Sequence, residues 1–171
     1  MAVRINEALR VAHGKNKDKR PGTGALVNAA GDRSIPVWGK RSAWGDASGP
    51  LAHGRVVGIG LFDHPKNVAH PTWWQARDAG LLSANPFGRN NFEKLKDQPD
   101  AGTRVIPAGG ELRLRFRLTF HRGDEKSARI AEPYRAYSAE KGGALPSVPA
   151  LTSRATGPWR LIFWPPSSRR L

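Results

Sequence analysis

The sequence predicts a mainly β fold, an antiparallel β-sandwich with one C-terminal helix. Over most of the chain, short apolar segments are separated by turns rich in glycine and proline, a spacing that is typical of all-β domains. Residues 112–120 give the clearest pattern, because leucine or phenylalanine occupies every second position. We therefore expect one face of this strand in the core and the other in water.

The N-terminal half supplies short strands and turns. Residues 3–11 alternate only weakly and fit either a strand or a short helix. Apolar residues mark three candidate strands: 25–27, 35–38 and 56–62. Gly31 suits the turn between the first two, because glycine adopts positive φ at little cost. The Gly, Ser and Pro residues within 44–50 predict another turn.

The C-terminal half continues with further strands and one helix. Two strands are expected at 74–77 and 81–84, followed by a polar loop over 89–101. Residues 103–106 and 111–120 then predict a hairpin, since Pro107 to Gly110 between them is a turn sequence.

Asp124 can cap the expected helix, which extends to about residue 141. Pro133 is expected to kink or end it, because proline lacks the N–H donor and crowds the preceding turn. Residues 1–141 therefore predict one domain. Residues 142–171, dominated by Gly, Pro, Ser and Arg, predict a mostly disordered tail in which only 159–164 could pack.

Composition and charge narrow the classes of function. The chain has no cysteine, which excludes disulfides, zinc–thiolate sites and thiol nucleophiles. It shows neither an apolar segment long enough to span a bilayer nor the apolar region of a signal peptide, so the sequence indicates a cytoplasmic protein without a membrane span. The net charge of +14 is compatible with a nucleic-acid partner. The charge is unevenly distributed, however, because all 14 acidic residues precede position 141 and the last 31 residues contain five basic residues and no acidic one.

The stretch from Asp63 to Trp74 is the densest in reactive side chains. Asp63, His64 and His70 leave three interpretations open. They can hold a loop by hydrogen bonds, act as acid and base on a bound substrate, or ligate iron, copper or manganese as two histidines and a carboxylate. Adjacent residues of a strand point to opposite faces, so Asp63 and His64 could share a metal only at a bend.

Two further groups are candidate substrate-binding residues. Consecutive residues Trp73 and Trp74 can both pack in the core, or one indole can be exposed as a stacking surface for a sugar ring. Arg113, together with the two other arginines of its strand face and with His121, could contact an anionic or carbohydrate ligand, although a solvated strand face is the simpler interpretation.

Several motifs in a fixed order resemble a known family. They are Trp38-Gly39-Lys40-Arg41, Phe62-Asp63-His64-Pro65, His70-Pro71-Thr72, Ala84-Asn85-Pro86-Phe87 and Pro107-Ala108-Gly109. Over roughly residues 20–140 the chain is similar to the bacterial family labelled "methane oxygenase PmoA". The resemblance implies a β-sandwich fold, a setting among carbohydrate-processing genes and members with additional strands upstream, so the chain is expected to be the C-terminal part of an incomplete domain.

These observations give one favoured function and two alternatives. We expect binding or processing of a polar, carbohydrate-like small molecule, with Asp63, His64 and His70 as the catalytic candidates. A metal-dependent oxygenase using Fe, Cu or Mn follows from the family label. A basic nucleic-acid-binding or purely structural fragment follows from the charge.

Overall fold

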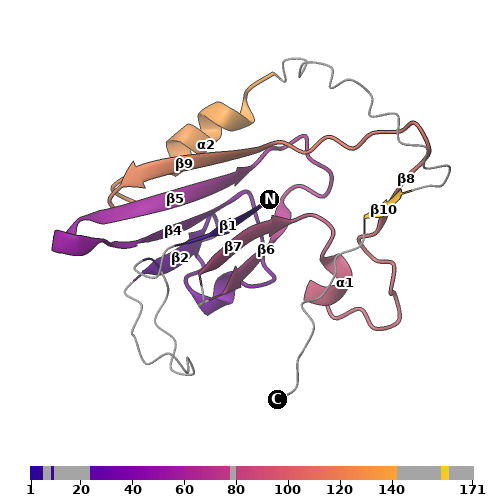
Figure 1. The fold of residues 1–171 in the computed structure, drawn as a ribbon, viewed down its shortest axis with the longest axis horizontal. Helices are drawn as coiled ribbons and strands as arrows, with labels where there is room; N and C mark the ends of the chain where they lie inside the picture. The colour runs from indigo at the N-terminus through magenta and orange to yellow at the C-terminus, as the bar shows by residue number, and fades with distance from the viewer. Residues whose placement is uncertain (6–8, 10–23, 78–79, 142–158, 162–171) are drawn as a thin grey trace. The chain divides into compact units, whose positions relative to one another are not determined.

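The structure, a computed structural model, describes residues 1–5, 9, 24–77, 80–141 and 159–161. It divides into two compact units (Figure 1). The first comprises Met1–Pro86 and Leu114–Lys141, and the second comprises Phe87–Arg113 and Gly142–Leu171. No helix of the described residues is long and apolar enough to cross a membrane.

Two four-stranded antiparallel sheets form the first unit, so the predicted mainly β, sandwich-like fold is confirmed. In sheet order, the first sheet contains β1 (Ala2–Arg4), β7 (Leu81–Asn85), β6 (Thr72–Arg77) and β3 (Arg41–Ser42). The second contains β2 (Ala25–Asn28), β4 (Trp44–Pro50), β5 (Val56–Asp63) and β9 (Phe116–Arg122). The predicted strands at 56–62, 74–77 and 81–84 correspond to β5, β6 and β7.

The core between these sheets is built from apolar side chains of both. Leu26 and Leu61 from one sheet and Trp74 and Leu82 from the other belong to the same buried cluster. Gly45 lies against this cluster, because a Cβ there would come within 2.9 Å of Trp74 Cε3. Small residues in β4 therefore let the large indole of the opposite sheet fit between the layers.

The outer face of the second sheet carries the helix α2 (Ala131–Ser138). Phe62 points to this face, and its ring packs edge-on against Tyr134 with the ring centroids 5.7 Å apart. Its chain neighbour Leu61 points to the core, as the alternation of a strand requires. The helix begins at Ala131 and not after Asp124, so the predicted start is wrong. Pro133 therefore lies in the first turn of α2, where a missing N–H costs nothing, and the prediction that it interrupts the helix is wrong as well.

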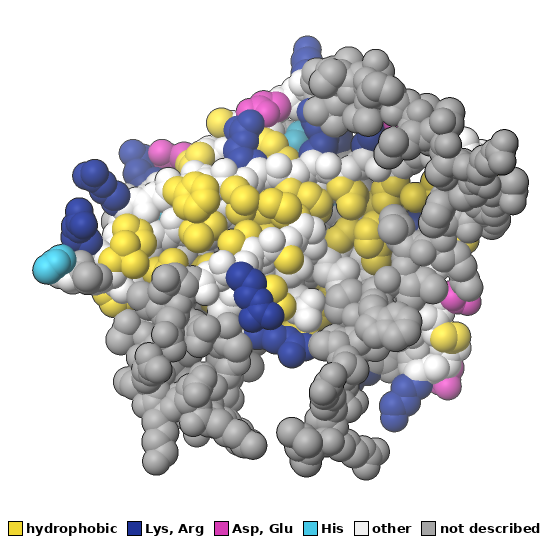
Figure 2. All heavy atoms as spheres, viewed as in Figure 1, with side chains coloured by type: hydrophobic (Ala, Val, Ile, Leu, Met, Phe, Trp, Pro, Cys, Tyr) yellow, Lys and Arg dark blue, Asp and Glu magenta, His cyan; other side chains and the backbone are white. Residues whose placement is uncertain are grey.

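One strand is only partly covered by the sandwich. Leu118 of β9 packs against the core, whereas Phe120 on the same face is 74% exposed. Figure 2 shows a band of hydrophobic side chains across this side of the molecule, in the region of β5 and β9. The apolar positions of 112–120 are therefore not all core positions, as the alternation alone predicted.

The second unit corrects the predicted hairpin. Strand β8 (Arg104–Ile106) pairs with β10 (Trp159–Leu161), and not with β9 of the first unit. The short helix α1 (Arg89–Phe92) lies in the expected polar loop. The rest of the tail, 142–158 and 162–171, lies outside the described residues, as does most of 3–11.

Two other predictions for the N-terminal half are also wrong. Residues 44–50 form β4 and not a turn, since the Gly and Ser residues there occupy crowded positions in the middle of a sheet. Residues 35–37 form the 3-10 helix η2 (Ile35–Val37) and not a strand. A second 3-10 helix, η3 (Ala52–Gly54), joins β4 to β5.

Candidate functional site

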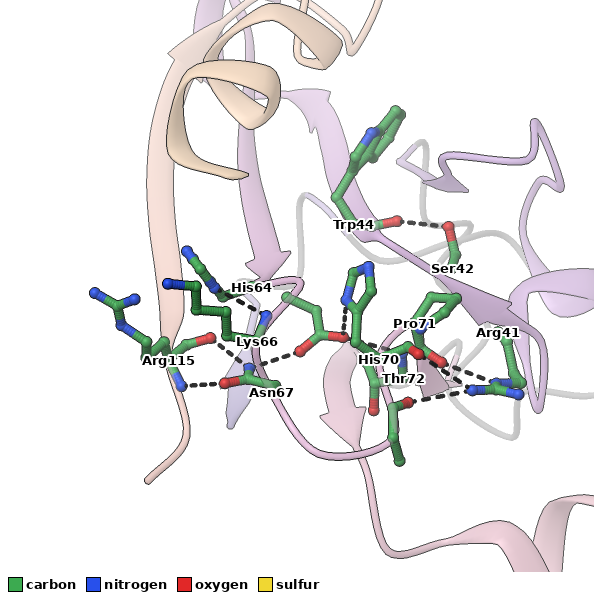
Figure 3. Close-up of polar contacts among 12 residues, drawn as sticks. Arg41, Ser42, Trp44, His64, Lys66, Asn67, His70, Pro71, Thr72 and Arg115 are labelled. Carbon is green, nitrogen blue, oxygen red and sulfur yellow. Dashed lines mark hydrogen bonds and ion pairs between the residues drawn. The ribbon is translucent and has the colours of Figure 1, made fainter. Parts of the chain in front are cut away.

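Asp63, at the end of β5, organises the loop that follows it. Figure 3 labels the residues of this loop that make polar contacts, among them Asn67, His70 and Thr72. Its side chain is 1% exposed, and its carboxylate oxygens accept three hydrogen bonds. The Asn67 amide donates to Oδ1 at 2.7 Å, the Thr72 backbone N–H donates to Oδ2 at 3.0 Å, and His70 Nδ1 contacts Oδ2 at 2.8 Å. A buried carboxylate that receives this many donors is well compensated for the loss of water.

Asn67 ties the same loop to the neighbouring strand. Its Nδ2 also donates to the Arg115 carbonyl at 2.6 Å, and its Oδ1 accepts the Arg115 N–H at 2.6 Å. The loop closes at His70-Pro71, a cis peptide bond. Asn67 was not among the predicted site residues, since a lone asparagine between Lys66 and Val68 carries no signal that would single it out.

His70 is the accessible partner of this buried carboxylate. Its side chain is 19% exposed, compared with 1% for that of Asp63. Because Nδ1 faces a carboxylate oxygen that can only accept, we assign the ring proton to Nδ1. Nε2 then carries the lone pair of a neutral imidazole. A carboxylate that orients an imidazole in this way is a recurrent arrangement in general acid–base catalysis.

His64 lies apart from this pair. It points to the opposite face of β5, where its ring packs edge-on against Tyr137 with the ring centroids 5.1 Å apart. Burial lowers the pKa of His64, and the positive charges of Arg115 and Lys66 lower it further, whereas the backbone and the charge of Glu140 oppose the shift. Asp63, His64 and His70 therefore do not converge, and among the described residues no three His, Asp or Glu side chains form a metal site. The three-ligand alternative is corrected on this ground.

Both tryptophans of the predicted stacking surface are buried. Trp74 lies in the core, and its indole N–H donates to the Ser42 carbonyl at 2.8 Å. Trp73 is 5% exposed, and the Arg41 guanidinium lies over its ring at 4.5 Å from the centroid. Neither indole presents an exposed face to a sugar, so the interpretation in which both pack in the protein is confirmed.

The predicted arginine face is divided between different contacts. Arg117 forms an ion pair with Glu140 at 2.8 Å and stacks on the Tyr137 ring. Arg113 belongs to the second unit, where it forms an ion pair with Glu111. Arg115 alone remains beside the Asp63 loop, joined to it through its backbone.

His121 belongs to a second carboxylate–histidine pair, on the outer face of the same sheet. Its Nε2 lies 2.7 Å from Asp46 Oδ2. The two side chains are 9% and 0% exposed. The ring lies over Gly58, where a Cβ would overlap it, which explains a glycine in the middle of β5.

Further charged groups surround Asp46. Burial raises the pKa of Asp46 to about 6, and Glu125 raises it as well, whereas hydrogen bonds from His121 and Ser48 oppose the shift. Glu125 is itself buried and forms an ion pair with Arg33. Asp46 Oδ1, His121 Nδ1 and Glu125 Oε2 have no hydrogen-bond partner among the described residues.

Neither Asp46 nor Glu125 was predicted from the sequence. Because 44–50 was predicted to be a turn, the strand alternation that places Trp44, Asp46 and Ser48 on one face of β4 was not considered. Glu125 lies outside the regular elements, where no periodic signal exists. The sequence therefore selected His121 without the carboxylate that holds it.

The first unit defines a mainly β, sandwich-like protein with a buried carboxylate–histidine pair at the end of one strand and another on an outer sheet face. The chain belongs to a family of unknown function, DUF6807, whose model matches residues 1–135. No curated protein and no solved structure is significantly similar to it. The family description does not mention the PmoA-like family, so that resemblance stays a prediction.

Proposed function

We propose that the protein binds or processes a polar, carbohydrate-like small molecule at the Asp63–His70 pair. The observation that carries the proposal is the 2.8 Å contact between a fully buried carboxylate and a partly exposed imidazole. Such a pair can accept a hydrogen bond from a ligand hydroxyl, or take a proton from it, through His70 Nε2.

The remaining contacts of the loop support this assignment. Asp63 is fixed from three directions, so the orientation of His70 is set before any ligand arrives. Preorganised groups of this kind cost little reorganisation on binding. The oxygenase alternative stays a prediction from the family label, although the ligand set first considered for it does not assemble, since only Asp63 and His70 meet. The nucleic-acid alternative is weakened, because Arg113 and Arg117 are already paired with glutamates.

A substitution at His70 tests the proposed function. His70→Gln retains a side-chain N–H that can donate to Asp63 but removes the basic nitrogen. The probe is a panel of neutral and acidic oligosaccharides, screened on an array and then titrated by calorimetry. We expect at least one to bind the wild-type protein, and we expect H70Q to weaken that binding about tenfold, the value of a hydrogen bond to a ligand.

His53→Gln is the matched control, because His53 is exposed in η3 and belongs to neither pair. H53Q should bind as the wild type does. Equal binding by H70Q and the wild type, or no binding by any member of the panel, would refute the proposed function.

A further inference from the structure

Two cationic side chains on the His64 side of the loop have no ion-pair partner among the described residues. Lys66 and Arg115 extend their side chains in the same direction as the His64 ring (Figure 3). Neither cation forms an ion pair with a carboxylate among the described residues, whereas the neighbouring Arg117 is paired with Glu140. Two positive charges without an ion-pair partner in the described part of the chain therefore lie beside the loop, Lys66 on it and Arg115 in the segment that leads into β9.

The buried ring next to these cations is also a donor. The Lys66 backbone N–H donates to His64 Nδ1 at 3.1 Å, so Nδ1 must be the unprotonated nitrogen of the neutral ring. The proton is then on Nε2. This N–H is buried, with the ring 99% shielded from water, and it has no hydrogen-bond partner among the described residues.

Tyr137 adds a second donor of the same kind. Its hydroxyl is buried and lacks a partner in the described part of the chain. Burial raises the pKa of Tyr137, so the phenol keeps its proton. Its ring lies against His64, so the two unpaired donors belong to neighbouring side chains. The Glu140 carboxylate is held by Arg117, and the Glu140 backbone carbonyl, which raises the pKa of His64, does not reach the Nε2–H with good hydrogen-bond geometry.

We infer that the His64, Lys66, Arg115 and Tyr137 side chains form a subsite for an oxyanion, and that the ligand of the proposed function is an acidic one, such as a sugar with a carboxylate, sulfate or phosphate group. The claim that the ligand is a sugar rests on the proposed function, whereas the claim that the ligand carries an anionic group does not. Every group without a partner here is a cation or a donor, and an oxyanion supplies only acceptors. Lys66 and Arg115 make the first contacts, and the two buried donors lie behind them.

Calorimetric titrations with three probes test the subsite. The probes are an oligouronate, the neutral oligosaccharide of the same length and linkage, and sodium sulfate, each at about 0.15 M salt so that long-range attraction is screened. We expect the oligouronate to bind at least tenfold more tightly than its neutral counterpart, and sulfate to bind weakly. The double variant K66A/R115A should abolish both the tenfold preference and the sulfate binding.

The matched control is R122A/K126A, which removes the same charge from exposed positions at and beyond the other end of β9. The backbone bonds of Arg115 to Asn67 persist in R115A, so the loop keeps its anchor. Equal affinity for the two sugars, or the same loss in the control as in K66A/R115A, would overturn the subsite while leaving the proposed function intact.

The carbohydrate function can also fail while the oxyanion subsite stands. Sulfate binding that depends on Lys66 and Arg115, without binding of either sugar, would support the subsite and refute the carbohydrate function. If none of the three probes binds, both are overturned.

Discussion

Asp63 and Asp46 are both buried and both contact a histidine, yet their surroundings differ. Asp63 accepts three hydrogen bonds with neither oxygen left over. Asp46 keeps one oxygen without a partner among the described residues and lies near a second buried carboxylate, Glu125. The first carboxylate is therefore suited to hold an imidazole in place. The second is suited to exchange a proton, since its pKa lies near 6.

The raised pKa of Asp46 predicts a pH dependence of stability. The folded protein binds this proton more tightly than the unfolded chain, whose aspartate titrates near 3.8. The associated stabilisation is complete below about pH 4 and is lost as the pH rises through about 6. Wild-type protein should thus lose stability relative to Asp46→Asn over this range, by on the order of 1 kcal/mol or more.

Urea unfolding at pH 4, 5, 6 and 7 measures this difference. Asp97→Asn, which removes an exposed carboxylate of the second unit, is the control and should follow the wild-type curve. A wild-type minus D46N difference that stays constant, or increases with pH, would contradict the assignment of the proton to Asp46.

At the scale of the element, the glycines inside β5 show which side chains pack against the outer face of the sheet. Gly58 and Gly60 lie inside β5, where a Cβ at Gly60 would come within 2.8 Å of Thr119 Cγ2. Their absent side chains leave room for His121 and Phe62 on the outer face of the sheet. The apolar residues of 56–62 predicted β5 despite these glycines, whereas the glycines of 44–50, which lack such apolar neighbours, predicted a turn in place of β4.

Gly58→Ala tests whether this space is required by His121. The added methyl group would overlap the imidazole and displace it from Asp46, at a cost of about 1–3 kcal/mol in the free energy of unfolding. In the double variant G58A/H121A the overlap with the imidazole disappears, and only the tight contact with the Ser48 Cβ at 3.0 Å remains. The cost of G58A should therefore be at least 0.5 kcal/mol smaller in the H121A background, roughly the lower limit for residues in contact. Strictly additive costs in denaturant unfolding would show that the ring does not occupy this space.

At the scale of the whole molecule, local sequence patterns predicted the positions of strands and helices better than they predicted which strands pair. The sandwich, the three best strands and the terminal helix follow from apolar alternation and turn residues, which are local signals. The pairing of β8 with β10 joins segments about fifty residues apart, and no local signal specifies it. Opposite faces for Asp63 and His64 could be predicted from strand geometry alone. The sequence left open which of Asp63, His64 and His70 would meet, and the loop that Asn67 anchors brings Asp63 and His70 together.

Membership of a family of unknown function places no chemistry on this fold, so the function must be argued from the site. The function proposed for the Asp63–His70 pair depends on His70 Nε2 being an unprotonated nitrogen in the neutral ring. That condition follows from one contact, the 2.8 Å approach of Nδ1 to Asp63.

Nitrogen-15 NMR of the histidine side chains measures this tautomer directly, without knowledge of the ligand. At a pH where the ring is neutral, long-range proton–nitrogen correlations distinguish a protonated Nδ1 from a protonated Nε2. We predict that His70 carries its proton on Nδ1 and that His64, by contrast, carries it on Nε2. A His70 ring protonated on Nε2 would leave no base for a substrate and would contradict the proposed function of the Asp63–His70 pair.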